Sequence, residues 1–446
     1  MRRSAQLLAS ISCVLMVVAA CGGGDFGIEH PGPSRGGAGA AAPTADRPLP
    51  PARSYDPPVH FNPDAAAPLP DEASEGAFNL GGDLRKPLPV ALVGTVAYIA
   101  ATDHLLVVET RTGQQLGAPI RPESGSGVAY APSGWAGDNP AEPPLPAAVD
   151  GSGRVYAAFI VDIPGSGTTP GHRSVELVGI EAPGARPVWR ATVPLEQWAS
   201  QTYDAVTAAP VWSDGRTVLV RVSSLGNSPD ATTYAIDATS GKIRWKQDDF
   251  AARVVAGDTA VGEVPSASFP AKVSGLSLPD GGVRWTNTES AHNVSIFPGG
   301  PSLVVAYGQT LGSQNFLSLL DAATGTVKDS GSGSYNGITC QYDGASVTVC
   351  HQSSFSRPWA AAFDTTTGDW LWTLPDNDAN RVAPTITSAW HGAVYGTTQS
   401  GPVILDARTG ADRATAPGAA PFIVNGNVGL ALDPNESDLW AFPADG

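Results

Sequence analysis

Two cysteines in the C-terminal half of the chain, Cys340 and Cys350, are the side chains whose spacing best defines a chemistry. They flank a predicted hairpin with Asp-Gly at residues 343–344, a dipeptide typical of tight turns. If the turn centres on residues 344–346, the two thiols face each other across antiparallel strands, which suits a disulfide. The alternative is a redox or metal site. It is disfavoured because neither cysteine belongs to a Cys-x-x-Cys motif and only His351 is near in sequence.

The remaining residues contain no complete catalytic or metal-binding motif. There is no His-Glu-x-x-His, no Gly-x-Ser-x-Gly and no Walker loop. The 7 histidines are scattered along the chain. The acidic stretches 376–380 and 433–438 lack the glycine and trailing glutamate of an EF-hand loop, so we interpret them as solvated turns. The sequence therefore predicts no catalytic residue, no cofactor-binding or metal-binding residue, and a protein that is not an enzyme.

A third cysteine, Cys21, follows an N-terminal targeting pattern. Arg2 and Arg3 precede an apolar run over residues 7–18 that is too short to span a bilayer as a helix. Residues 18–21, Val-Ala-Ala-Cys, resemble the bacterial lipobox. This resemblance implies removal of a signal peptide over residues 1–20, attachment of diacylglycerol to the Cys21 sulfur, and palmitate among the lipid chains. The alternative is an ordinary secretory peptide in which Cys21 has no role.

The segment that follows has the composition of a tether. Residues 22–77 are rich in Gly, Ala and Pro and poor in large apolar side chains, so they bury too little surface to offset the entropy of ordering. We therefore predict a lipid-anchored, disordered tether over residues 21–77 and a folded domain over residues 78–446.

Any site in this domain must be positioned by the structure that a recurring sequence motif forms. This motif, called the repeated phrase below, consists of an acidic residue, two or three small residues and a glycine. The glycines at 241, 281, 325, 368 and 410 are separated by 40, 44, 43 and 42 residues. Each glycine supplies the positive φ of a tight turn, and each acidic side chain can accept backbone N–H groups. Periods of this length, between runs that read as β-strands, are typical of four-stranded propeller blades.

The phrase closely resembles the pyrroloquinoline-quinone-type propeller repeat, Ala-x-Asp-x-x-Thr-Gly-x-x-x-Trp. The match is best at residues 235–245 and 362–372, and looser copies surround Gly113, Gly184 and Gly281. The resemblance implies an all-β fold, a single β-propeller, in which Trp189, Trp245, Trp285 and Trp372 pack between neighbouring blades. It implies little about function, because enzymes and non-enzymatic scaffolds share the repeat.

The two ends of the domain each carry part of a blade. The C-terminal residues 422–442 supply three strands, and residues 78–85 resemble a turn followed by a last strand. We expect these ends to pair within one blade, which closes the ring and covers its edge strands. With this blade the count is eight. Seven is the alternative, because the glycines at 82, 113 and 184 are unevenly spaced.

One insertion is a candidate contact surface. Residues 121–146, between predicted blades, place Tyr130 and Trp135 among Gly and Pro. Loops longer than about 12–15 residues tend to be functional or disordered. We therefore propose Tyr130 and Trp135 as the candidate interaction surface. Three further tryptophans outside the repeat position are possible contact residues: Trp198, Trp359 and Trp390.

The charge balance restricts the class of partner. Without Arg2 and Arg3 the mature chain has 24 basic and 42 acidic residues, a net charge of about −18. Nucleic acids and anionic lipid surfaces both require a basic patch, so neither is predicted as a partner. A disulfide also fits an exported protein.

These observations predict a monomeric propeller, held to the cell membrane by lipid on Cys21 and facing outside the cytoplasm. Its expected function is that of a non-enzymatic scaffold for other envelope proteins, whose identity is unknown. The alternatives are a propeller that binds a small molecule or glycan, and a quinone-dependent dehydrogenase. The quinone enzymes of this fold are similar in carrying an adjacent-cysteine disulfide and a calcium ion held by Glu, Asn and Asp. The cysteines here are 10 residues apart, which disfavours that alternative.

Overall fold

The structure is a computed structural model that divides the chain into two compact units, residues 1–51 and 52–446. The description that follows concerns the second unit. The residues that the structure describes are 51–75, 77–78, 86–127, 141–149, 151–201, 206–224, 230–265, 271–287, 291–333, 337–352, 358–433 and 438–446.

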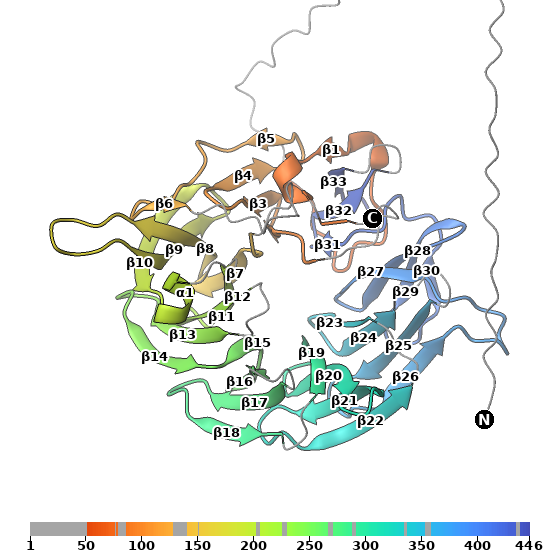
Figure 1. Cartoon of the computed structure of the whole chain (residues 1–446). Coiled ribbons are helices and arrows are strands. Elements are labelled where there is room, and N and C mark those ends of the chain that lie inside the picture. Colours follow the sequence, from red (N-terminus) through yellow and green to blue (C-terminus); the bar gives the residue numbers. More distant parts are fainter. Residues whose placement is uncertain are drawn as a thin grey trace, which may run out of the picture. The chain divides into compact units, whose positions relative to one another are not determined.

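Eight antiparallel sheets are arranged around a common centre (Figure 1). In Figure 1 the first strand of most sheets lies near the centre, as β11, β15 and β23 do, and the last strand lies at the perimeter, as β14, β18 and β26 do. The prediction of an all-β propeller with eight blades is confirmed, and a count of seven is excluded.

Blade 1 consists of β2 (Val90–Val93), β3 (Val96–Ala100), β4 (Leu105–Glu109) and β5 (Gln114–Gln115). Blade 2 consists of β6 (Ser126–Gly127), β7 (Leu145–Val149), β8 (Ser152–Ile163), β9 (His172–Ala182) and β10 (Arg186–Pro194). Blade 3 consists of β11 (Val206–Ser213), β12 (Thr217–Ser224), β13 (Ala231–Asp237) and β14 (Ile243–Asp248), and blade 4 of β15 (Ala251–Ala256), β16 (Thr259–Val264), β17 (Lys272–Ser277) and β18 (Val283–Thr286).

Blade 5 consists of β19 (Ala291–Pro298), β20 (Leu303–Thr310), β21 (Asn315–Asp321) and β22 (Val327–Gly333), and blade 6 of β23 (Ile338–Tyr342), β24 (Val347–Gln352), β25 (Trp359–Asp364) and β26 (Trp370–Leu374). Blade 7 consists of β27 (Thr385–Trp390), β28 (Ala393–Thr398), β29 (Gly401–Asp406) and β30 (Asp412–Ala414). Blade 8 consists of β31 (Ile423–Val424), β32 (Val428–Leu432), β33 (Leu439–Pro443) and β1 (Ala67–Pro68).

Helix is scarce in the described residues. Two short 3-10 helices, η1 (Pro63–Ala65) and η2 (Asp71–Ala73), precede the first blade, and α1 (Gln197–Gln201) follows β10. None of these described helices has the length and apolar character needed to cross a bilayer.

The core consists of apolar clusters between adjacent blades. All five side chains of β3 are buried, and the clusters combine residues of neighbouring sheets, as Tyr156 of blade 2 with Tyr234 of blade 3. Both faces of each sheet are covered, so the middle strands are apolar throughout rather than alternating. Burial of this surface, at about 25 cal/mol per Å², is the main favourable term for the fold.

The repeated phrase forms the turn that it predicts. In blade 3 the Asp237 carboxylate accepts the backbone N–H groups of Thr239, at 3.0 Å, and Ser240, at 2.7 Å. Gly241 has φ 69° and donates its N–H to the Asp237 carbonyl at 2.8 Å. The Ser240 N–H and the Arg244 guanidinium hold the pKa of Asp237 well below its ordinary value. The same turn recurs in later blades, which explains the fixed period.

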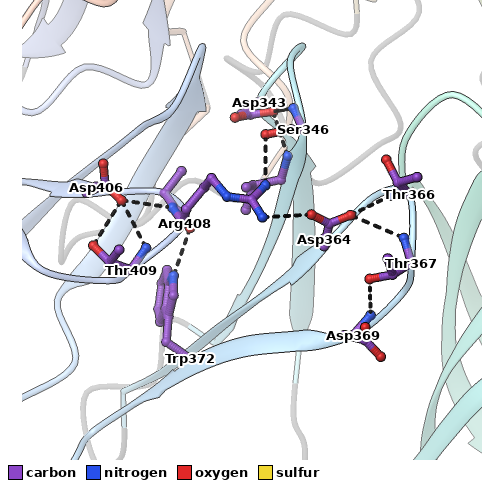
Figure 2. A network of polar contacts seen from close by, with 12 residues as sticks. Asp343, Ser346, Asp364, Thr366, Thr367, Asp369, Trp372, Asp406, Arg408 and Thr409 are labelled. Atoms are coloured by element: carbon purple, nitrogen blue, oxygen red, sulfur yellow. Dashed lines mark hydrogen bonds and ion pairs between the residues drawn. The ribbon is translucent and has the colours of Figure 1, made fainter.

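These turns also connect neighbouring blades (Figure 2). Arg408, in the turn of blade 7, donates to Asp364 of blade 6 at 2.9 Å and to Ser346 at 3.4 Å. Trp372 of blade 6 lies beneath the same turn and donates its indole N–H to the Ala407 carbonyl at 2.8 Å. Each turn is therefore held by the blade before it.

Three of the four predicted inter-blade tryptophans dock on the turn of the next blade. Trp245, Trp285 and Trp372 each donate Nε1–H at 2.8 Å to a carbonyl of the next blade. Each ring also lies against the turn glycine of that blade. A Cβ on Gly281, Gly325 or Gly410 would come within 2.8 Å, 2.5 Å and 2.8 Å of the ring, respectively.

Trp189 is partly buried against the cluster between blades 2 and 3, but it does not dock on the turn of blade 3 as the other three rings dock on theirs. This ring packs edge-on against Tyr156 of its own blade, with centroids 5.6 Å apart, and Ala191 is the residue that approaches the turn glycine of blade 3. The physical reason is register. Trp189 follows Gly184 by five residues rather than four, and the β10–β9 pairing shifts between Pro187 and Trp189.

The ring is closed by strands from both ends of the domain, as predicted, but by a different N-terminal strand. Ala67 and Pro68 of β1 pair with Ala441 and Trp440 of β33. The sequence placed this strand at residues 78–85. In the structure Phe78 contacts Phe422, with ring centroids 5.1 Å apart, and residues 79–85 lie outside the described part of the chain.

The predicted boundary between tether and domain at residues 77 and 78 is also corrected. Residues 52–77 belong to the folded unit. Phe61 is fully buried, and the backbone N–H of Tyr55 donates to the Gly426 carbonyl at 2.7 Å. Composition misleads here because a few buried apolar side chains and backbone hydrogen bonds to the last blade are enough to order a proline-rich segment. Residues 1–50 lie outside the described part.

Candidate functional site

The predicted disulfide is present. Cys340 of β23 lies directly opposite Cys350 of β24, their Cα atoms are 4.0 Å apart, and the two sulfur atoms are bonded. Cys340 is 3% exposed and Cys350 is fully buried. Redox exchange or metal binding requires an accessible sulfur, so this bond joins two strands of blade 6 and does not form a reactive centre.

The other predicted site residues, Cys21, Tyr130 and Trp135, lie outside the described part of the chain. The residues that flank the insertion are described, and they show where it leaves the propeller. β6 ends at Gly127 and β7 begins at Leu145, and both pair with the same strand, β8. The insertion therefore interrupts the innermost strand of blade 2. The sequence placed it between blades, because only two strand residues, 126–127, precede it.

A buried carboxylate anchors the first flank. Glu176 of β9 is 1% exposed and accepts the backbone N–H groups of Glu123, at 2.9 Å and 3.0 Å, and Ser124, at 2.7 Å. The Ser124 hydroxyl also donates to it, and Arg190 Nη1 of β10 lies 2.5 Å from its Oε1. The segment 121–124 is thus tied to the outer strands of blade 2.

The electrostatics of Glu176 show that this anchor is charged. Burial by itself would raise the pKa of Glu176, but hydrogen bonds from Ser124, from the Glu123 N–H and from Arg190 outweigh it, so the pKa lies below its ordinary value. Removing any of these donors would leave a buried charge poorly compensated.

Close backbone contact continues along the first flank. A Cβ on Gly125 would lie 2.5 Å from the Asp162 carbonyl oxygen, and a Cβ on Gly127 would lie 2.7 Å from the Asp103 Cα. Only glycine allows the chain to approach β8 and blade 1 this closely.

A second ion pair anchors the other flank to the next blade. Glu142 Oε1 lies 3.1 Å from Arg221 Nη2 on β12, and the Arg221 side chain is 11% exposed. The pKa of Arg221 lies below its ordinary value, because burial lowers it by more than the neighbouring Glu142 carboxylate raises it. The two ends of the insertion are therefore held by buried charges on blades 2 and 3.

A cleft lies at the interruption of the innermost strand. It encloses about 380 Å³ only when its open mouth is counted, so the enclosed space is much smaller than an ordinary ligand pocket. Its lining comes from blades 1, 2 and 3 and from the second flank: Ala101, Thr102, Ala141, Glu142, Ala158, Phe159, Ile160, Val206, Thr207 and Ala208. Glu142 is its one titratable side chain, and Arg221 already engages that carboxylate.

The described residues contain no cluster of side chains that could hold a metal ion. Nowhere in this part of the chain do three or more His, Cys, Asp or Glu side chains converge as metal ligands. His351 is buried, and burial lowers its pKa to about 4. In the acidic stretch 376–380, the Asp376 carboxylate accepts the N–H groups of Asp378 and Ala379, both at 3.0 Å, as in an ordinary turn.

The disulfide of this chain differs from the one that lines the cofactor pocket in the quinone enzymes of this fold. The disulfide joins opposite residues of two paired strands and is buried, so it cannot line an open pocket. In the described part of the chain, no group of three or more Asp, Glu, His or Cys side chains converges as it would around a metal ion.

Among the described tryptophans, the exposed one is Trp370, which was not predicted as a contact residue. The three other tryptophans that were expected as possible contact residues are all partly buried: Trp198, Trp359 and Trp390. Trp370 of β26 is 43% exposed. Its position two residues after the turn glycine of blade 6 was a usable signal, because the same position carries exposed Ile243, Val283 and Val327 in blades 3, 4 and 5.

Comparison with known proteins agrees with this architecture. The profile of the family described as "Outer membrane protein assembly factor BamB" matches residues 142–348, from blade 2 into blade 6. Protein Rv3035 of Mycobacterium tuberculosis (strain ATCC 25618 / H37Rv) is 32% identical over 145 residues, which is 32% of this chain. The match spans 31% of that relative's length.

Two solved structures are similar in fold. BamB from Moraxella catarrhalis has a TM-score of 0.39 and 15% identity over 81% of this chain and 94% of its own. The quinohemoprotein alcohol dehydrogenase ADHIIG from Pseudomonas putida HK5 has a TM-score of 0.43 and 10% identity over 79% and 73%. At these values neither indicates a function. The geometry of the repeat and the family profile together show that the chain is a β-propeller of the pyrroloquinoline-quinone repeat type.

Proposed function

We propose that this protein is a non-enzymatic propeller scaffold that binds other proteins of the cell envelope through the insertion at residues 121–146. It is anchored in the membrane by lipid on Cys21 and faces outside the cytoplasm. Tyr130 and Trp135 are its contact residues, because large aromatic side chains contribute most to protein interfaces.

The observation that supports this proposal is the anchoring of both flanks of the insertion. Glu176 and Arg190 hold the first flank, and Arg221 holds the second. Two largely buried ion pairs therefore fix the two ends of one insertion on the propeller. A loop whose two ends are already fixed loses less entropy on binding than one whose ends are free, which favours recognition of a partner.

The family profile supports the same class of function. It describes an assembly factor of outer membrane proteins, and its match includes the second flank of the insertion and blades 3–5. A small-molecule function is less well supported, since the cleft beside the insertion is small and its carboxylate is engaged by Arg221.

The test is photo-crosslinking in intact cells. A crosslinking amino acid is placed at Ser133 in the insertion and, as a control, at Val283, which is 62% exposed on blade 4. We expect reproducible capture of a small set of envelope proteins from Ser133 and not from Val283. The capture is lost when Trp135 is replaced by alanine. Identical capture from the two positions, or no capture from Ser133, would reject the proposal.

Membrane anchoring is tested separately by replacing Cys21 with alanine. The protein loses its acyl acceptor, so we expect incorporation of labelled palmitate to disappear and the protein to move from the membrane to the soluble extracytoplasmic fraction. Replacement of Cys13, which lies within the predicted signal peptide, is the matched control and leaves both unchanged. Retention of the Cys21→Ala protein in the membrane fraction would show that another segment anchors it.

A further inference from the structure

Blade 5 lacks the inter-blade tryptophan, although the blades on either side of it, 4 and 6, both have one. In blades 3, 4 and 6 the fourth residue after the turn glycine is a tryptophan that docks on the next blade. In blade 5 the fourth residue after Gly325 is Asp329. The contact between blades 5 and 6 must therefore be made in another way.

A leucine on the neighbouring strand compensates for the missing ring. The residue opposite each docked tryptophan is small: Ala235 opposite Trp245, Gly275 opposite Trp285 and Ala362 opposite Trp372. Opposite Asp329 lies Leu319, whose Cδ2 is 3.0 Å from the position that a Cβ on Gly368 would occupy. Leu319 thus packs on the turn glycine of blade 6 in place of an indole.

Because leucine is smaller than tryptophan, a hollow remains at the contact between blades 5 and 6. It encloses about 220 Å³ including its mouth, and most of its surface is apolar. We call it the blade 5–6 groove and define it by its lining residues: Val305, Leu317, Ser318, Leu319, Asp329, Cys350, Phe363 and Trp370.

The rim of the groove combines an exposed aromatic ring with a carboxylate. Trp370 is 43% exposed, packs edge-on against Phe363 with centroids 5.6 Å apart, and donates Nε1–H to Asp329 Oδ2 at 2.7 Å. This hydrogen bond fixes the ring beside the carboxylate. Asp329 itself is exposed, and the adjacent Lys328 contacts Asp321 instead, at 3.7 Å.

We propose that the rim of the blade 5–6 groove, formed by Trp370 and Asp329, binds an arginine side chain of a partner protein. The guanidinium stacks on the exposed face of Trp370 and donates hydrogen bonds to the Asp329 carboxylate. Each oxygen of this carboxylate already accepts one hydrogen bond, Oδ1 from the Ser330 N–H at 2.8 Å and Oδ2 from Trp370, and each has a second lone pair. The chain has 42 acidic and 26 basic residues, so its field attracts a basic partner to this rim. This inference rests on the proposed function of binding proteins, but it uses a surface on blades 5 and 6 rather than the insertion.

The test uses the full chain labelled with 5-fluorotryptophan and observed by fluorine NMR. Replacement of Trp370 by phenylalanine identifies its resonance. The probe is the peptide acetyl-Leu-Arg-Leu-amide, and the control peptide has glutamate in place of arginine. We expect the arginine peptide, and not the glutamate peptide, to shift the Trp370 resonance saturably. Added salt weakens the response, because the contact is charged and exposed.

A matched pair of variants separates the carboxylate from overall charge. Asp329→Asn is expected to weaken binding of the arginine peptide roughly tenfold, because it removes the charge beside the ring. Asp378→Asn makes the same change of net charge in another turn and leaves the affinity unchanged. Thermal unfolding of each variant confirms that the fold is retained.

Two outcomes would overturn this inference. One is a Trp370 resonance that does not respond to the arginine peptide in the intact protein. The other is a response of equal strength in the Asp329→Asn variant or with the glutamate peptide. Crosslinking from Ser133 tests binding through the insertion only. If that crosslinking succeeds while the peptide experiment gives either of these two outcomes, the proposed function stands and arginine binding at the blade 5–6 groove is rejected.

Discussion

Replacement of Phe61 by alanine is expected to lower the free energy of unfolding by about 3–5 kcal/mol, the usual range for a fully buried phenylalanine. The side chain is completely buried, its ring centroid lies 6.0 Å from that of Tyr395 in blade 7, and its ring touches Gly429 of blade 8. The truncation leaves a cavity that the backbone cannot refill. At Gly418 a Cβ would already lie 2.1 Å from the Phe61 carbonyl oxygen, so the two segments are in close contact.

The measurement is the urea midpoint of tryptophan fluorescence, with the slope checked for change. Phe26→Ala is the matched control, because the same substitution falls in residues 1–51, outside the propeller unit. We expect the Phe26 variant to unfold at the midpoint of the unmodified protein. If the Phe61 variant did so as well, residues 52–77 would not contribute to the propeller, and the tether boundary expected from composition would be right.

The second large effect is expected from Glu176→Gln. Loss of one partner of a buried ion pair typically costs about 3–5 kcal/mol. Here we expect about 2–3 kcal/mol, because Arg190 is 23% exposed and keeps Glu123 as a second partner at 3.0 Å. The variant also releases the first flank, so limited proteolysis is expected to cleave within residues 121–140 several-fold faster.

The pH dependence of this effect follows from the direction of the pKa shift. The pKa of Glu176 is lowered in the folded protein, so its ionised form stabilises the fold. The stability difference between the unmodified protein and Glu176→Gln is therefore expected to be constant above the ordinary value of 4.5 and to shrink as the pH falls through the folded pKa.

Glu181→Gln provides the control on the same strand. Glu181 pairs with Arg186 at the surface, where the two side chains are 50% and 72% exposed. Surface pairs of this kind contribute about 0–1 kcal/mol. Equal effects of the two substitutions on stability and proteolysis would contradict the role assigned to Glu176.

Much of the fold could be predicted from local pattern. The turn at residues 237–241 depends on side chains and N–H groups within five positions, so its sequence is sufficient to predict it. The Cys340–Cys350 bond was also predictable, because a short hairpin brings the two residues together without help from the rest of the chain. Eight blades and closure by both termini follow from the count and the incomplete end blades.

The candidate site was only partly predictable. The insertion was recognised by its length, but its anchors were not. Glu176 is separated from Ser124 by 52 residues in the chain, and Arg221 is separated from Glu142 by 79. No local pattern marks either pair, since a glutamate or an arginine in a strand is equally compatible with an exposed position.

Short-range chemistry thus decided the turns, the blades and the disulfide of this propeller, because each depends on neighbours in sequence. Contacts between distant segments decided the rest. Phe61 is ordered by contacts with residues of the last two blades. Leu319 packs on the turn glycine of blade 6, because the residue opposite it on the next strand is Asp329 and not a tryptophan. The ends of the insertion lie where buried charges on blades 2 and 3 meet them. The free energy of such contacts comes from burial and charge pairing that exist only once the blades have assembled.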